Sequence, residues 1–140
     1  LLGELYVFLS RQPGAENSGE LAEEARGAYL RALETVPEDI ATLLAVARLE
    51  MYSQNDPAAA SRLEQVLFID PDHWEAHLLL SQVRERFGEW QAATLHLWHA
   101  RDLDRASNPR LSAADYRQRL QRLYAELVTQ EGGTTDASDP

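Results

Sequence analysis

The sequence predicts an all-α protein, built as a stack of three helix pairs that one further helix closes at the C-terminal end. Two observations lead to this fold class. First, small residues recur every 34 residues, at Ala25, Ala59 and Ala93. Second, small or apolar residues follow each of them four and seven positions later, which is the spacing of one face of an α-helix. A fixed period of this length is typical of stacked two-helix repeats.

The same period holds at three further positions of the repeat. The matching sets are Tyr29, Leu63 and Leu97; Ala32, Val66 and Ala100; and Pro37 and Pro71. Small residues at both ends of a helix face let a neighbouring helix approach closely, and the larger residue between them fills the remaining space. We therefore expect these faces to be buried between helices.

Seven helices are expected from the repeat and its boundaries. Their ranges are 1–11, 20–35, 40–53, 57–69, 74–87, 89–103 and 113–129. The residue pairs that indicate helix starts are Asp56 with Pro57, Asp72 with Glu75, and Ser112 with Asp115. Gly88 is expected in the turn inside the third pair, where a left-handed backbone conformation costs glycine little.

One domain is expected over residues 1–129. Its repeat units lie at about 1–39, 40–73 and 74–107, and a capping helix lies at 113–129. About ten residues are inserted in the first unit, so Gln12 to Gly19 should form a loop. Residues 130–140 have the composition of a disordered tail. Since the sequence starts at Leu1 rather than at a methionine, we expect it to be part of a longer chain.

Composition excludes several classes of function. The net charge is −10, which argues against nucleic acid as a partner because such proteins need a cationic surface. All 13 basic residues are arginine, and residues 101–122 hold six of them against three aspartates. The absence of cysteine excludes disulfides and thiolate metal sites. No stretch approaches the roughly 20 apolar residues that span a bilayer, so direct membrane insertion is not expected.

The search for catalytic chemistry indicates that the protein is not an enzyme. The serines lack a strand–turn–helix context, and no glycine-rich phosphate loop exists. His73 with His77, and His96 with His99, have spacings that zinc sites use on helices, but neither pair has an obvious third ligand. Packed or surface histidines are therefore the favoured interpretation, and we expect neither a metal nor a cofactor.

The pattern resembles the tetratricopeptide repeat (TPR) family over roughly residues 1–107. The third unit is the most similar, at Leu80, Ser81, Phe87, Gly88, Ala93, Leu97, Ala100 and Leu103, and Asp70-Pro71 closes the second unit as the family pattern does. The resemblance implies a right-handed stack. It also implies a concave groove, lined by the first helix of each pair, that holds a protein or peptide partner.

Register with the family predicts the groove residues. They are Leu44, Arg48, Met51 and Tyr52 in the second unit, and Leu78, Gln82, Glu85 and Arg86 in the third. This set predicts an apolar groove with a few arginines, suited to an amphipathic helix or an extended apolar peptide. For the two leucines, packing between adjacent helices is the alternative.

A finer resemblance concerns the opening Leu1-Leu2-Gly3-Glu4 and the turn from Ser107 to Leu111. Both are similar to bacterial TPR subunits that help to attach haem to c-type cytochromes. This similarity implies an exported or membrane-tethered protein that holds the C-terminal segment of an apocytochrome.

Two classes of function stay open. One is a scaffold or chaperone-like adaptor that holds a peptide segment of a client protein. The other is structural, with self-association or docking inside the parent chain through the basic C-terminal region and the acidic remainder.

Overall fold

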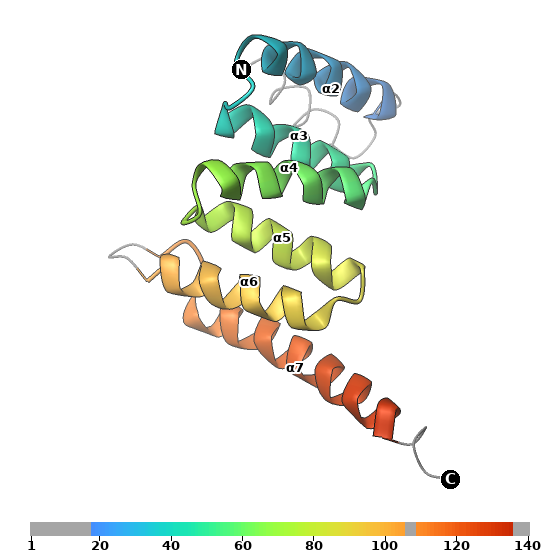
Figure 1. The fold of residues 1–140 in the computed structure, drawn as a ribbon, viewed down its shortest axis with the longest axis vertical. Coiled ribbons are helices and arrows are strands. Elements are labelled where there is room, and N and C mark those ends of the chain that lie inside the picture. The colour runs from blue at the N-terminus through green and yellow to red at the C-terminus, as the bar shows by residue number, and fades with distance from the viewer. Residues whose placement is uncertain (1–17, 106–108, 136–140) are drawn as a thin grey trace. The chain divides into compact units, whose positions relative to one another are not determined.

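The computed structural model describes residues 18–105 and 109–135. All regular structure in these two ranges is helical, which confirms the all-α fold class. The helices are α2 (Ser18–Thr35), α3 (Ile40–Tyr52), α4 (Asp56–Ile69), α5 (Trp74–Arg86), α6 (Trp90–Leu103) and α7 (Ala113–Thr135) (Figure 1). The helix expected at 1–11 lies outside the described residues, as does most of the expected 12–19 loop. Ser18 and Gly19, the last residues of that loop, instead begin α2.

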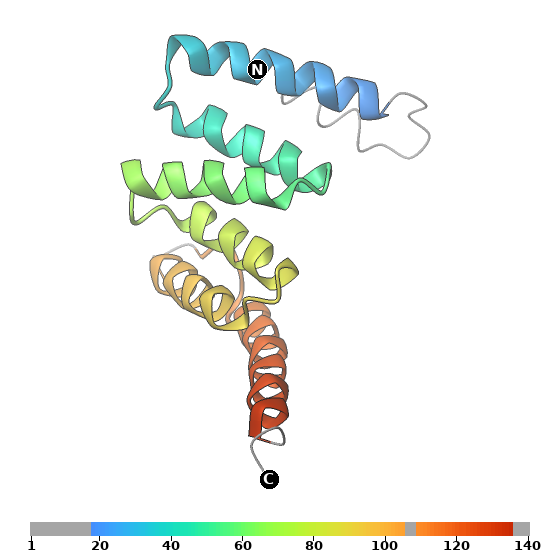
Figure 2. The same cartoon turned by 45° about the vertical axis from the view of Figure 1, so that its right-hand side comes forward.

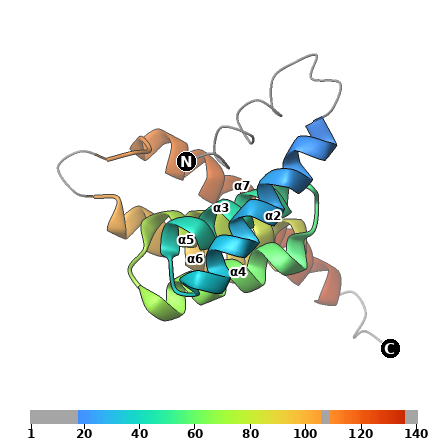
Figure 3. The ribbon, with the colours of Figure 1, turned by 90° about the horizontal axis from the view of Figure 1, so that it is seen from above.

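The chain divides into two compact units, residues 1–71 and 72–140, close to the expected border between the second and third repeats. In the first unit, α2 packs against α3 and α3 against α4 (Figure 2). Figure 3 shows α2 lying across α3 when this unit is seen from above. In the second unit, α5 packs against α6 and α6 against α7. None of the helices in the described residues is both long and apolar enough to cross a membrane.

The two turns inside the helix pairs repeat one another, hydrogen bond for hydrogen bond. In the first, the N–H groups of Ser53, Gln54 and Asn55 donate to the carbonyls of Leu49, Met51 and Glu50 at 2.9, 3.1 and 2.8 Å. In the second, those of Phe87, Gly88 and Glu89 donate to Val83, Glu85 and Arg84 at 3.2, 3.0 and 2.9 Å. The central residue of each turn is left-handed, with φ of 59° at Gln54 and 72° at Gly88. The expectation for Gly88 is confirmed, and Gln54 adopts the same conformation without being glycine.

The expected start of α4 and the expected capping residue of α5 are each wrong by one residue, whereas the start of α5 at Trp74 is confirmed. α4 begins at Asp56 itself, and Asn55 occupies the N-cap position without a side-chain capping bond. α5 is capped by His73 rather than Asp72, because the His73 ring Nδ1 accepts a hydrogen bond from the N–H of Ala76 at 3.3 Å. In both places two adjacent polar residues can cap, and the sequence pattern does not distinguish between them.

The start of α7 is confirmed and its end is not. Ser112 Oγ accepts from the N–H of Asp115 at 3.1 Å, and the Asp115 carboxylate accepts from the N–H of Ser112 at 3.2 Å, which is a reciprocal capping box. The expected tail at 130–140 is corrected for its first six residues, since α7 continues to Thr135. Because a helix of about five turns is already nucleated, its extension can tolerate a pair of glycines.

The repeated faces form the core of each unit. Ala25, Ala59 and Ala93 are all fully buried, as expected from the period. The first unit departs at one position, because Ala32 is exposed and the neighbouring Leu33 is buried instead. In the second unit, the core cluster consists of Leu78, Ala93, Leu97, Ala100, Tyr116, Leu120 and Leu123, with Trp74, Trp90 and Leu111 packed against it.

Candidate functional site

The predicted groove residues of the first unit lie on α3 and differ in exposure. Leu44 and Met51 are buried, with 6% and 8% of their surface exposed, so they support the helix packing rather than face a partner. Arg48 is half-buried. Tyr52, at the end of α3, is 42% exposed and is the one member of this set with a large accessible side chain.

The predicted residues of the second unit separate into core and surface. Leu78 belongs to the core cluster, so the alternative of packing between helices describes it. Gln82, Glu85 and Arg86, one to two turns further along α5, line a cavity of about 620 Å³. Its other wall is formed by Asp115, Gln118, Arg119 and Arg122 of α7. We call this cavity the α5–α7 groove.

Some of the charged groups in the α5–α7 groove are already paired. Arg122 Nε lies 2.8 Å from Glu85 Oε1, and Arg122 Nη2 donates to Glu85 Oε2 at 3.1 Å, which links the two walls. The carboxylate of Asp115 caps α7, and hydrogen bonds from the side chain and backbone of Ser112 hold the pKa of Asp115 below its usual value. These groups shape the groove and are not available to a ligand without breaking those bonds.

Three other groups in the groove keep their binding capacity. The side chains of Gln82, Gln118 and Arg119 form no hydrogen bond in the parts of the chain that the structure describes, and the guanidinium of Arg119 interacts with Asp115 only through its charge. A glutamine amide donates and accepts, and a guanidinium presents a fork of donors that matches a carboxylate. The groove therefore has the chemistry to bind a peptide backbone and an acidic group.

A buried hydrogen-bond network fixes α7 against the other two helices. Asp104, at the end of α6, accepts from the N–H groups of Arg110 and Leu111 at 2.8 and 2.9 Å and from the hydroxyl of Tyr116 at 2.7 Å. The indole N–H of Trp74, on α5, donates to the same hydroxyl at 2.7 Å. The carboxylate of Asp104 and the hydroxyl of Tyr116 thus link α5, α6 and α7.

The same network shifts the pKa values of its members. Burial raises the pKa of Asp104, but the hydrogen bonds from Arg110, Tyr116 and Leu111 outweigh it and leave that pKa below its usual value. Burial and the neighbouring Asp104 raise the pKa of Tyr116 to about 12, so its hydroxyl stays protonated and can donate.

The histidines come together in a way that their sequence spacing does not predict. His77 of α5 lies against both His96 and His99 of α6, with ring centroids 5.4 and 5.1 Å apart. Burial and the proximity of His77 lower the pKa of His96 to about 4. Within the described ranges, no group of three or more histidines and carboxylates is arranged to hold a metal ion.

The wall contributed by α7 is the part of the site that the sequence analysis missed. Register with the repeat predicts groove residues only on the first helix of each unit, including Glu4, Val7 and Phe8 of the first unit, which lie outside the described residues. A usable signal is the polar stripe of α7, Asp115, Gln118, Arg119 and Arg122, which runs beside its apolar stripe at helical spacing.

Comparisons with known proteins add to this description. No protein-family model and no curated protein matches the sequence. Solved structures with a similar fold include MamA, at 23% identity and a TM-score of 0.68, covering 80% of this chain and 62% of that one. The Sgt2 TPR domain from Aspergillus fumigatus is 17% identical with a TM-score of 0.68, covering 99% of this chain and 85% of that one.

A third similar structure is the first TPR of Spaghetti (RPAP3) bound to an HSP90 peptide. It is 11% identical with a TM-score of 0.69, and the match covers 91% of this chain and 94% of that one. The chain spans less than two thirds of the length of MamA. Together these likenesses show that the chain has a TPR-like, all-α repeat fold.

Proposed function

We propose that this chain is a protein-interaction module, a scaffold or chaperone-like adaptor, that holds a peptide segment of a client protein in the α5–α7 groove. The observation that carries this function is the presence of Gln82, Gln118 and Arg119 in one groove, with side chains that form no hydrogen bond among the described residues. The two amides suit the backbone of an extended peptide, and the guanidinium suits a carboxylate of its side chain or terminus. No catalytic step is part of this function.

The client segment differs in character from the one that the sequence predicts. An apolar groove is expected from Leu78, but that side chain is buried in the core, and all seven residues that line the α5–α7 groove are polar or charged. Three arginines face two acidic residues there, which leaves one excess positive charge. A polar, acidic client segment therefore complements the groove better than an amphipathic helix.

The peptide complex of Spaghetti supports the general function by analogy of fold, since a TPR domain of similar fold is bound to a peptide in that structure. We further propose that the client is an apocytochrome and that the process is the maturation of c-type cytochromes in bacteria. The support for this finer assignment is the sequence resemblance at residues 1–4 and 107–111.

Selection from a library of displayed random peptides tests the general function. The immobilised chain should enrich acidic peptides, whose affinity is then measured by fluorescence anisotropy. Gln118→Ala with Arg119→Ala, the groove variant, should weaken binding by about tenfold or more, because anchor residues contribute about 2 kcal/mol or more. The groove variant should keep the circular dichroism spectrum of the parent chain.

A matched control makes this experiment specific. Gln65→Ala with Arg62→Ala removes the same two residue types from α4, where Arg62 Nη1 donates to Gln65 Oε1 at 3.4 Å on an exposed surface. The control should bind as the parent does. If both variants bind the selected peptides with the affinity of the parent chain, the α5–α7 groove is not the binding site.

The finer assignment needs its own ligand. A fluorescein-labelled peptide with the C-terminal segment of a bacterial apocytochrome c should bind the parent chain saturably and bind the groove variant more weakly. Failure of this peptide, while selected acidic peptides still bind, would reject the apocytochrome and keep the module.

A further inference from the structure

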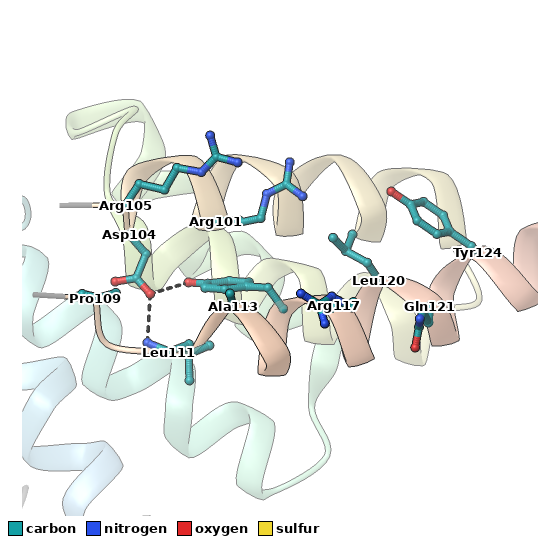
Figure 4. A pocket seen from close by; sticks show the side chains of 11 residues that line it. Arg101, Asp104, Arg105, Pro109, Leu111, Ala113, Arg117, Leu120, Gln121 and Tyr124 are labelled. Carbon is teal, nitrogen blue, oxygen red and sulfur yellow. Dashed lines mark hydrogen bonds between the residues drawn. The ribbon is translucent and has the colours of Figure 1, made fainter. Parts of the chain in front are cut away.

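A second groove lies on the opposite face of α7. A cavity of about 580 Å³ opens between α6 and α7, and its lining residues on α7 stand about half a helical turn away from those of the α5–α7 groove. Figure 4 shows Arg101 and Arg105 extending from α6, and Arg117 and Gln121 extending from α7, with Leu120 between them. We call this cavity the α6–α7 groove.

The three arginines of the α6–α7 groove lack close acidic partners. The Nε atom of Arg101 is buried without a hydrogen bond to any described residue. The carboxylate of Asp102 lies 3.8 Å from that atom and 4.0 Å from Nε of Arg105, beyond hydrogen-bond range. Arg117 forms no ion pair in the described part of the chain. Asp102 therefore compensates the positive charge of this end of the groove only in part, through two long ion pairs on an exposed surface.

A second acidic residue of the groove, Asp104, does not remove the remaining positive charge. Asp104 also lines the groove, but its two carboxylate oxygens already accept the three hydrogen bonds from Arg110, Leu111 and Tyr116. Its role is to hold the turn before α7, which leaves the guanidinium groups of the groove free to bind an external carboxylate.

Towards the other end, the α6–α7 groove becomes apolar and aromatic. The indole N–H of Trp98 donates to the hydroxyl of Tyr124 at 2.9 Å, and these two rings remain 37% and 40% exposed. Leu95 and Val128, one turn further along α6 and α7, are 49% and 69% exposed. Helical register thus places a strip of exposed apolar side chains in line with the arginine cluster.

The dimensions and chemistry of this strip fit a helix. Leu95 and Arg101 are six residues apart on α6, which corresponds to about 9 Å, and Arg105 lies in the turn just after this helix. In a repeat stack, the place beside α6 and α7 is also where the second helix of another repeat would pack. A helix placed there would bury the apolar strip along most of its length and bring one end to the arginines.

We propose that the α6–α7 groove binds an amphipathic helix of a partner protein, whose apolar stripe covers Leu95, Trp98, Leu120, Tyr124 and Val128 and whose carboxylates, grouped at one end, pair with Arg101, Arg105 and Arg117. This site is separate from the α5–α7 groove. The chain then holds two segments at once, an extended acidic one on one face of α7 and a helical one on the other.

The probe for this site is a stapled helical peptide labelled with fluorescein. It carries a leucine stripe and three glutamates in one terminal turn, and two versions place the glutamates in the first or the last turn. At least one version should bind the parent chain, and its affinity should fall as salt rises. The same peptide with glutamine in place of glutamate should bind about tenfold more weakly, because each exposed ion pair contributes a factor of about two to five.

Two charge-matched variants locate the probe. Arg101→Glu with Arg117→Glu should weaken its binding by about tenfold or more. Arg31→Glu with Arg62→Glu changes the net charge equally in the first unit and should leave binding as it is. The groove variant, Gln118→Ala with Arg119→Ala, should also bind the probe normally, so failure at one groove is distinguishable from failure at the other.

This inference would be overturned if neither stapled peptide bound the parent chain. It would also be overturned if the glutamine peptide bound as tightly as the glutamate peptide, or if the Arg101→Glu/Arg117→Glu variant bound the probe as tightly as the parent chain. A dimer in sedimentation equilibrium that the Arg101→Glu/Arg117→Glu variant dissociates would overturn it as well, since the occupant would then be a second copy of this chain.

Discussion

Removing the carboxylate of Asp104 should destabilise the second unit more than any other single change to a polar side chain that we consider. In Asp104→Ala, the N–H groups of Arg110 and Leu111 and the hydroxyl of Tyr116 lose their acceptor. The indole of Trp74 keeps its bond to Tyr116, but that hydroxyl must then reorient. Three of the bonds that tie α5, α6 and α7 together are weakened by one substitution.

The size of the effect follows from these bonds. A hydrogen bond to a charged acceptor contributes about 1.5–3 kcal/mol when buried. Arg110 is exposed, so water can replace the carboxylate as the acceptor for its N–H. Removal of the buried Asp104 charge also removes its desolvation cost, which offsets another part of the lost hydrogen-bond energy. We expect a loss of about 3 kcal/mol in the free energy of unfolding, which lowers the thermal midpoint by roughly 10 °C.

Urea denaturation followed by tryptophan fluorescence and circular dichroism measures this loss. The control is Asp102→Ala, whose side chain is 61% exposed and contacts arginines only at 3.8 and 4.0 Å, so it should change stability by less than about 0.5 kcal/mol. Equal midpoints for Asp104→Ala and Asp102→Ala would refute the network as the support of α7.

The dependence on pH adds a second test of Asp104. Its pKa is lower in the folded chain than in the unfolded chain, so its contribution is complete above the unfolded value of about 3.9. As pH falls through the folded pKa, the contribution disappears. The stability difference between the parent chain and Asp104→Ala should therefore be constant near neutral pH and shrink below about pH 4. A difference that grows on acidification would contradict the assigned direction.

Three further predictions concern packing, turn strain and titration. Ala93→Leu should overpack a fully buried site and cost about 1–3 kcal/mol, whereas Ala125→Leu, on the exposed face of α7, should not; coincident thermal midpoints would show that the register is wrong. Gln54→Gly should stabilise the chain by about 0.5–1 kcal/mol in urea denaturation, because Gln54 has a left-handed backbone, and a loss of stability would contradict this. Since the pKa of His96 falls from 6.5 to about 4 on folding, the unfolded chain binds more protons between these values. Stability should therefore fall by about 1–2 kcal/mol as pH drops through that window, since solvent screens part of the effect at this half-buried ring, and His96→Gln should remove most of this dependence in denaturation curves measured across it.

The 34-residue period predicts the paired helices of the described residues, and the reason is physical. Ala59 and Ala93 are fully buried because close helix packing requires a small residue at that position. The same requirement applies in each repeat, so a small residue recurs at that position of the sequence. Helix ends are decided by weaker, local competitions, as between Asp72 and His73 for the cap of α5. Gly132-Gly133 looked like the start of a tail, but the cost of glycine in a helix does not by itself end one.

The candidate site could be predicted only in part. Register correctly indicated Gln82, Glu85 and Arg86 as one surface, because residues three and four apart share a helix face. It did not separate them from Leu78, whose burial depends on how α6 and α7 pack around it. The repeat pattern does not predict the α6–α7 groove. The charge of this groove depends on the hydrogen bonds from Arg110 and Leu111 to Asp104, and the pattern does not specify the conformation of that turn.

The most direct measurement of the central claim is an amide chemical-shift titration of the ¹⁵N-labelled chain with an acidic peptide from the display selection. Binding in the α5–α7 groove predicts that the largest shifts fall on Gln82, Gln118, Arg119 and the residues next to them, and on the side-chain amides of both glutamines. The signals of Arg62 and Gln65, on α4, should not move. Shifts that leave α5 and α7 unchanged, or that concentrate on α4, would contradict the proposed function.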